Sequence, residues 1–150
     1  MNYGEILLVE DNPDDEELTL LALARSKLQT KISVARDGVE ALDFLFGRGT
    51  YSERKNAHLP QVVFLDLKLP KVDGIEVLHQ IRSNERTKRL PVVILTSSKE
   101  QHDVTNGYDH GANSYIVKPV DTQQFMDSIA QLGCYWIAIN QVEIPIAVPT

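Results

Sequence analysis

The chain has 150 residues, of which 43% are hydrophobic and 24% charged, and its formal net charge is −6. This length fits one domain that buries roughly 68–70% of its unfolded surface. The acidic balance argues against a nucleic-acid-binding protein. There is also no apolar stretch near the ~20 residues of a membrane span, and no signal-peptide pattern.

Cysteine and histidine usage adds little chemistry. Cys134 is the single cysteine, so an internal disulfide is impossible and a cytoplasmic location is expected. We expect it to be a packed thiol on a late helix, with an interchain bridge as the alternative. The four histidines are scattered without metal-ligand spacing, which predicts surface or structural roles for His58, His79, His102 and His110.

Short apolar strands alternate with helical patterns along the whole chain. The strands are expected at 6–9, 32–35, 62–65, 92–95 and 115–117, and the helices at 13–28, 38–46, 74–84, 100–110 and from 121 onward. The strands are apolar without alternation, which is typical of strands covered on both faces. Strict alternation therefore predicts an α/β fold with a doubly wound, five-stranded parallel sheet in the flavodoxin-like order 2-1-3-4-5.

Apolar spacing predicts which side chains of the helices are buried. In the first helix they are Leu18, Leu21, Ala22 and Leu28, in the second mostly Val39, Leu42, Phe44, Leu45 and Phe46, and in the last Phe125, Ile129, Leu132, Trp136 and Ile139.

Three connecting or terminal segments stand out. Residues 47–60 are predicted to be a long exposed loop and residues 86–89 a solvated connector. Helix 100–110 has few large apolar residues, so it is a candidate for movement. The apolar, proline-containing tail 142–150 is expected to be extended, and docking on its own domain, pairing with another chain and disorder all remain open.

Polar residues follow four of the strands at the point where each strand ends. Glu10 and Asp11 follow the first strand, Asp66 the third, Thr96 the fourth and Lys118 the fifth. Ligands bind at the carboxyl ends of parallel strands, so these side chains should converge on one edge. Carboxylate oxygens in an open site favour Mg²⁺ or Mn²⁺. An acidic rim without an ion is the alternative for Glu10 and Asp11.

The remaining groups suit a phosphoryl group. Lys118 is a point charge for a phosphoryl oxygen, and the Thr96 hydroxyl can donate to a second oxygen. Asp66 can act as a carboxylate nucleophile and form an aspartyl-phosphate.

The segments that contain these residues resemble the receiver domain of two-component response regulators. They are Leu8–Asn12, Asp66–Pro70 with Asp73-Gly74, Leu95–Ser98 and Tyr115–Pro119, and the resemblance runs from about residue 6 to 131. It implies one receiver domain over 1–150, with a core at about 4–131 and an extended C-terminal helix and tail at 132–150.

The resemblance also implies a role for each site residue. Asp66 would accept a phosphoryl group from a histidine kinase, and Lys118 would bind that group. Mg²⁺ would be held by Asp11, Asp66, the Lys68 carbonyl and, through water, Glu10. Thr96 and Tyr115 would form the switch pair.

Three finer expectations follow from the family. The Lys118-Pro119 peptide is often cis in it. Glu10 stands where many members have Asp, so metal binding should survive. The side chains of Lys68 and Ser98 should alter the lifetime of the acyl phosphate, in a direction that the sequence does not give.

The 47–60 segment and the Trp136-containing helix resemble the small response regulators of cyanobacterial phytochrome kinases. This implies a phytochrome as the possible kinase partner. It also implies a possible homodimer through the face of the fourth helix, fifth strand and fifth helix, with the C-terminal extension. No output domain is seen, so the protein should act by binding another protein rather than as an enzyme.

Three other protein classes fit less well. A phosphatase of the dehalogenase type needs Asp two residues after the nucleophile, where Lys68 stands. A flavodoxin needs a phosphate loop, whereas the acidic residues 10–15 would repel FMN. A receiver-like module that has lost phosphorylation conflicts with the complete set of site residues.

Overall fold

The computed structural model describes residues 4–55 and 57–141, which form a five-stranded, all-parallel sheet in the order β2-β1-β3-β4-β5. Its strands are β1 Gly4–Val9, β2 Thr30–Ala35, β3 Val62–Leu65, β4 Val92–Thr96 and β5 Ser114–Val117. The predicted fold class and strand order are confirmed.

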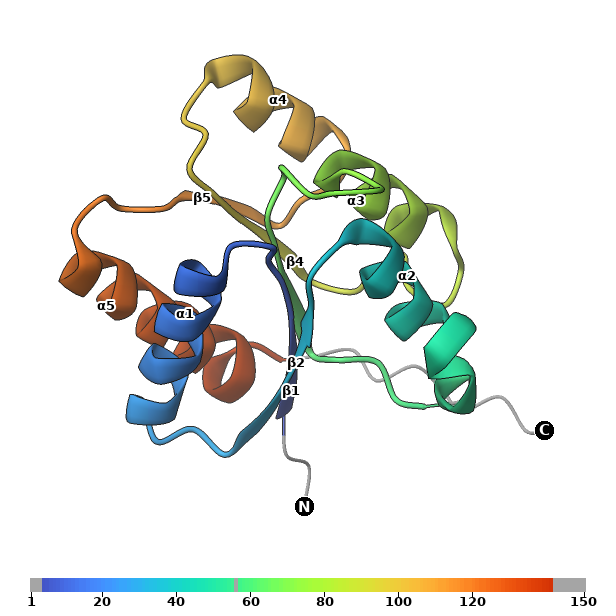
Figure 1. Ribbon diagram of the computed structural model, residues 1–150, viewed down its shortest axis with the longest axis horizontal. Helices are drawn as coiled ribbons and strands as arrows, with labels where there is room; N and C mark the ends of the chain where they lie inside the picture. Colours follow the sequence, from blue (N-terminus) through green and yellow to red (C-terminus); the bar gives the residue numbers. More distant parts are fainter. Residues whose placement is uncertain (1–3, 56, 142–150) are drawn as a thin grey trace.

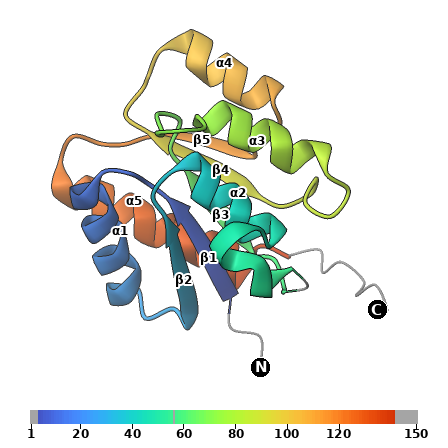
Figure 2. The same ribbon diagram turned by 45° about the vertical axis from the view of Figure 1, so that its right-hand side comes forward.

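Helices cover both faces of this sheet (Figures 1 and 2). They are α1 Pro13–Arg25, α2 Gly38–Phe46, α3 Gly74–Ser83, α4 Gln101–Asp109 and α5 Thr122–Gly133. Helices α1 and α5 lie side by side on one face, and α2 and α3 lie on the other. Alternate residues of β1 accordingly enter different cores, with Leu7 and Val9 toward α2 and α3, and Ile6 and Leu8 toward α1 and α5.

Four helices begin at a side chain that caps their free backbone N–H groups. Asn12 Oδ1 accepts from the N–H groups of residues 14 and 15 at the start of α1. Asp37, Asp73 and Asp121 each accept from the N–H three residues later. An N-cap of this kind stabilises a helix by about 1 kcal/mol. These caps fix the residue at which each of α1, α2, α3 and α5 begins, after the loop that follows the preceding strand.

Helix α4 is held differently. Of its nine residues only Gly107 is buried. A Cβ on Gly107 would lie 2.7 Å from Ile94 Cδ1 and 3.2 Å from Tyr115 Cδ2, so glycine allows α4 to lie close to the sheet. The expected weak attachment of this helix agrees with the small area that it buries.

Several predicted burial assignments are wrong. Leu21 is 41% exposed and Leu28 lies beyond the end of α1, whereas the apolar residues of α2 are mostly buried as expected, with Val39 exposed at 39%. Thr19 and Leu23 are buried in α1 beside the expected Ala22. Cys134 is exposed rather than packed.

The connecting segments 47–60 and 86–89 are more structured than expected. Residues 47–60 contain the 3-10 helix η1, Gly49–Arg54, whose Tyr51 ring packs edge-on against Phe44. In the 86–89 connector Thr87 is fully buried and donates to the Ile81 carbonyl. Arg86 donates to two backbone carbonyls, at 2.7 and 2.6 Å. The prediction of a solvated connector is therefore wrong.

Helix α5 continues into a π-helical turn, η2 Cys134–Ile139. Trp136, expected at helical spacing with Phe125 and Ile129, is buried there, whereas Ile139 is 67% exposed. The tail 142–150 lies outside the described residues. Within the described chain, no helix has both the length and the apolar character needed to cross a membrane.

Candidate functional site at the carboxyl edge of the sheet

The predicted site residues meet at the carboxyl edge of the sheet. Glu10 follows β1, where its N–H donates to the Ala35 carbonyl of β2. Asp66 follows the adjacent strand β3, and its N–H donates to the Val9 carbonyl. The Lys118 N–H donates to the Thr96 carbonyl. Sheet hydrogen bonds thus position the residues that precede each loop.

The Lys118 side chain is the centre of the site. It is only 8% exposed, and its Nζ lies 2.5 Å from Glu10 Oε1, 2.8 Å from Asp15 Oδ2 and 3.2 Å from Asp66 Oδ2. One ammonium group thus binds carboxylates from three separate segments of the chain. The convergence that the sequence predicted is confirmed for Glu10, Asp66 and Lys118.

Glu10, Asp11 and Asp66 form a carboxylate cluster, with one oxygen of each lying within 4.8 Å of the others. All of the ligand atoms that these residues offer to a metal are oxygens, and the Asp11 side chain is exposed, so a cation can enter from solvent. Such donors in an open site suit a small, hard divalent ion that keeps some of its water. The cluster therefore fits Mg²⁺ or Mn²⁺.

Burial and neighbouring charge shift the protonation of this site. Burial raises the pKa of Glu10 from 4.5 to about 7; the hydrogen bond from Lys118 opposes this, and the charge of Asp66 adds to it. Burial alone would lower the pKa of Lys118, but its hydrogen bonds to Asp15 and Glu10 and the charge of Asp66 raise it above its ordinary value. The ammonium therefore stays charged.

Asp15 is a site residue that the sequence reasoning missed. The sequence assigns it only to the acidic first turn of a helix, where anionic side chains are favoured. Its position could have signalled more, because it is the third residue after the Asn12 cap and so lies on the first turn that follows β1. Asp15 completes the set of acceptors around Lys118.

The expected switch pair lies on the adjacent strands β4 and β5, where Thr96 stands opposite Val117 and Tyr115 stands opposite Ile94. Thr96 is fully buried, and Tyr115 is half-buried against the core. The Tyr115 hydroxyl donates to the Ser98 carbonyl at 2.8 Å, and the Ser98 hydroxyl donates to Asp103 Oδ2 at 2.5 Å. The loop after β4 is thus tied to both β5 and α4.

Lys68 lies beside the cluster with an exposed side chain, and its N–H donates to Asp66 Oδ1 at 3.3 Å. The described residues contain no cis peptide bond, so Lys118-Pro119 is trans here. This differs from the form that is frequent in the resembled family.

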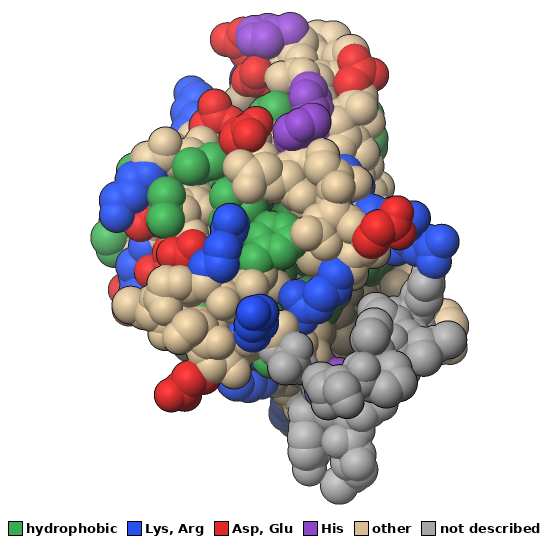
Figure 3. Space-filling model, turned by 90° about the vertical axis from the view of Figure 1, so that its right-hand side faces the viewer, with side chains coloured by type: hydrophobic (Ala, Val, Ile, Leu, Met, Phe, Trp, Pro, Cys, Tyr) green, Lys and Arg blue, Asp and Glu red, His purple; other side chains and the backbone are tan. Residues whose placement is uncertain are grey.

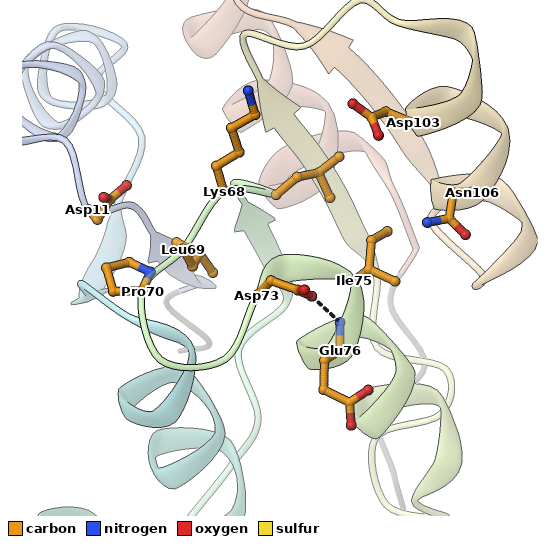
Figure 4. A pocket seen from close by; sticks show the side chains of 10 residues that line it. Asp11, Lys68, Leu69, Pro70, Asp73, Ile75, Glu76, Asp103 and Asn106 are labelled. Atoms are coloured by element: carbon orange, nitrogen blue, oxygen red, sulfur yellow. Dashed lines mark hydrogen bonds between the residues drawn. The ribbon is translucent and has the colours of Figure 1, made fainter.

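An open depression of about 730 Å³ borders the site between the loop after β3 and helix α4 (Figure 4). Asp11 lies at one side of it, and Asp103 and Asn106 of α4 face it from the other side. Asp73 lies on its wall, with its carboxylate turned to cap α3. Solvent and ligands in this depression can therefore reach Asp11 of the carboxylate cluster.

The model of the response regulator receiver domain matches residues 6–130 of this chain. The chain belongs to that family. It is thus a response regulator of two-component signalling, whose family function is that of a phosphoacceptor.

Two curated relatives span nearly the same length. The probable methanogenesis regulatory protein FilR2 of Methanothrix harundinacea is 40% identical over 91% of this chain and 85% of its own. The response regulator Rcp1 of Synechocystis is 36% identical over 95% of this chain and 93% of its own.

Solved structures agree with the fold. The phosphorylated cyanobacterial phytochrome response regulator RcpA has a TM-score of 0.87, with 37% identity over 94% of this chain and 99% of its own. The Mn²⁺-bound form of Rcp1 has a TM-score of 0.86, with 34% identity over 93% and 99%. The bacteriophytochrome response regulator RtBRR has a TM-score of 0.75, with 49% identity over 97% and 86%.

Proposed function

We propose that this response regulator accepts a phosphoryl group on Asp66 from the phosphohistidine of a histidine kinase, in the presence of Mg²⁺. The observation that carries the proposal is the contact of Lys118 Nζ with Asp66 and Glu10, which together with Asp11 form the carboxylate cluster. A buried ammonium beside a carboxylate at the open edge of the sheet is the arrangement that transfer of an anionic group needs.

Each site residue has a defined part in this transfer. An Asp66 carboxylate oxygen attacks phosphorus, a P–O bond forms, and the P–N bond breaks, with its electron pair going to the imidazole nitrogen of the kinase. Lys118 turns from its carboxylate partners to a phosphoryl oxygen, and Thr96 donates to a second oxygen. Mg²⁺, held by Glu10, Asp11, Asp66 and the Lys68 carbonyl, would supply positive charge where negative charge accumulates.

Movement of Thr96 toward the phosphoryl group would be passed to Tyr115 and α4. The bonds from Tyr115 to the Ser98 carbonyl and from Ser98 to Asp103 join these elements. Since α4 buries little, modest changes at its start can shift it. We propose this path as the link between phosphorylation and output.

We further propose that the cognate kinase is a phytochrome and that the protein works in the cytoplasm as a single receiver domain. The names of RcpA and RtBRR support light signalling, whereas the name of FilR2 points to another input. A homodimer through the face of α4, β5 and α5 is the proposed output. Its support is the exposed apolar side chains of Tyr108 and Val117 on that face, and of Ile139 on the extension.

The test of the acceptor is phosphorylation with acetyl phosphate and Mg²⁺, read by intact-protein mass spectrometry and Phos-tag electrophoresis. Asp66→Asn should abolish the added phosphoryl mass. The matched control is Asp14→Asn, which changes an exposed aspartate of the first turn of α1 and should leave phosphorylation unchanged. Phosphorylation that persists in Asp66→Asn would show that another residue is the acceptor.

The kinase is tested separately, by the rate of phosphotransfer from purified histidine kinases of the source organism. Preference for a phytochrome kinase, and its dependence on red or far-red light, is the expected result. Rapid transfer from a light-insensitive kinase only would exclude the phytochrome assignment while leaving the role of Asp66 intact.

A further inference from the structure

Two histidine rings, one on α3 and one directly after α4, lie in contact. His79 lies in the second half of α3, and His110 is the residue after α4. Their ring centroids are 6.2 Å apart and the ring planes meet at 78°. Helices of a parallel sheet run opposite to the strands, so these positions lie away from the carboxyl edge that holds Asp66.

Both rings are accessible to an ion in solution. His79 is exposed and His110 is partly exposed. Histidine side chains are visible at the upper end of the face drawn in Figure 3. Among the described residues, no hydrogen bond or ion pair occupies the His79 ring nitrogens.

The hydrogen bond of His110 leaves one ring nitrogen free to bind a metal. Its Nδ1 lies 2.8 Å from the Asn106 carbonyl, which can only accept. Nδ1 therefore carries the hydrogen, and Nε2 presents a lone pair. A ligating histidine typically donates its other N–H to a carbonyl or carboxylate in this way.

The separation of the rings suits one shared metal ion. Zn–N bonds of about 2.0–2.1 Å place the centroids of two imidazoles on one ion about 5–6.5 Å apart, depending on the N–Zn–N angle. The observed 6.2 Å lies inside this range, near the wide-angle end. A shift of ~1 Å by the exposed His79 side chain would reach a tetrahedral angle.

The backbones that carry the two rings are already fixed to one another. The Arg82 side chain at the end of α3 donates from Nε to the Gly111 carbonyl at 2.9 Å and from Nη2 to Asn113 Oδ1 at 2.9 Å. A site on fixed elements loses little conformational freedom on binding.

We propose that His79 and His110 bind a divalent transition metal ion of the Zn²⁺ class, with water in the remaining positions, and that the ion joins α3 to α4. Imidazole nitrogens select such ions over Mg²⁺. The site is thus distinct from the carboxylate cluster in both place and metal preference. The ion would add to the Arg82 contacts that already hold the end of α4 to α3.

The test is isothermal titration of the full chain with Zn²⁺ in saturating Mg²⁺, in a Cys134→Ser background that removes thiol binding. One Zn²⁺ per chain should bind. His79→Gln and His110→Gln should each weaken binding by at least about 10-fold. The control is His102→Gln, which changes a histidine at the opposite end of α4, where Glu100 and Asp103 lie beside the ring. This variant should bind Zn²⁺ as tightly as the parent.

Thermal unfolding provides the second measurement. Zn²⁺ should raise the Tm of the parent protein by mass action, and the rise should disappear in both variants. Unchanged Zn²⁺ affinity in His79→Gln or in His110→Gln would overturn the shared site, and the pair would then be a ring contact alone. Loss of binding in His102→Gln with retention in the other two would place the ion at Glu100 and Asp103 and likewise overturn the proposal.

Discussion

Replacing Lys118 by methionine removes the one ammonium group that neutralises the buried part of the site. The length and apolar stem of the side chain are retained, but Glu10, Asp15 and Asp66 lose a common partner at 2.5, 2.8 and 3.2 Å. Breaking a buried ion pair by removing one partner costs about 3–5 kcal/mol. Asp15 is 29% exposed and can be rehydrated, so we expect the lower value, about 3 kcal/mol.

The measurement is urea and thermal unfolding at pH 8 without divalent ions. For a chain of this size, ~3 kcal/mol corresponds to a Tm lowered by about 10 °C. Mg²⁺ should recover more stability in Lys118→Met than in the parent, because it then provides the missing charge. The control is Lys99→Met, an exposed lysine in the loop before α4. Equal stability of the parent and Lys118→Met at pH 8 would refute this account of the site.

Three further changes test other parts of the structure. Burial raises the pKa of Glu10 to about 7, so the protonated Glu10 side chain favours the folded state. This contribution to the free energy of unfolding is complete below pH 4.5 and is lost as pH rises through 7, by up to about 3 kcal/mol. Glu10→Gln should flatten this pH dependence of stability in urea unfolding without metal. Gly107→Ala should displace α4, because the added Cβ would lie 2.7 Å from Ile94 Cδ1, and amide shifts in α4 and β5 should change despite the better helix propensity of alanine. Arg86→Ala should lower stability by about 2 kcal/mol in urea unfolding, since two backbone carbonyls lose a charged donor.

Each of these changes has a control or a contradicting result. Glu17→Gln alters an exposed glutamate of α1 and should keep the parent pH slope. For the glycine change, amide shifts confined to residues next to position 107 would mean that the neighbours yield without moving the helix. A fully stable Arg86→Ala would mean that water replaces its two hydrogen bonds at no cost.

The sequence by itself determined the strands, their order and the edge at which Glu10, Asp66 and Lys118 meet. A buried parallel strand must be apolar along its whole length, and the first polar residue after it marks the carboxyl end. The helix caps can also be read from the sequence, because Asp37 and Asp73 each accept a hydrogen bond from an N–H group only three residues away. Local patterns therefore carry most of the fold and most of the site.

Only the tertiary structure decided features that depend on contacts between distant segments. The distance from Asp15 to Lys118 spans 103 residues, and its partner cannot be read from either neighbourhood. Arg86 looks like a solvated charge until the carbonyls of Leu45 and Ala57 are brought to it. The same holds for the pairing of His79 with His110, because neither has a second histidine at metal-ligand spacing in its own segment and the tertiary structure brings α3 beside the end of α4.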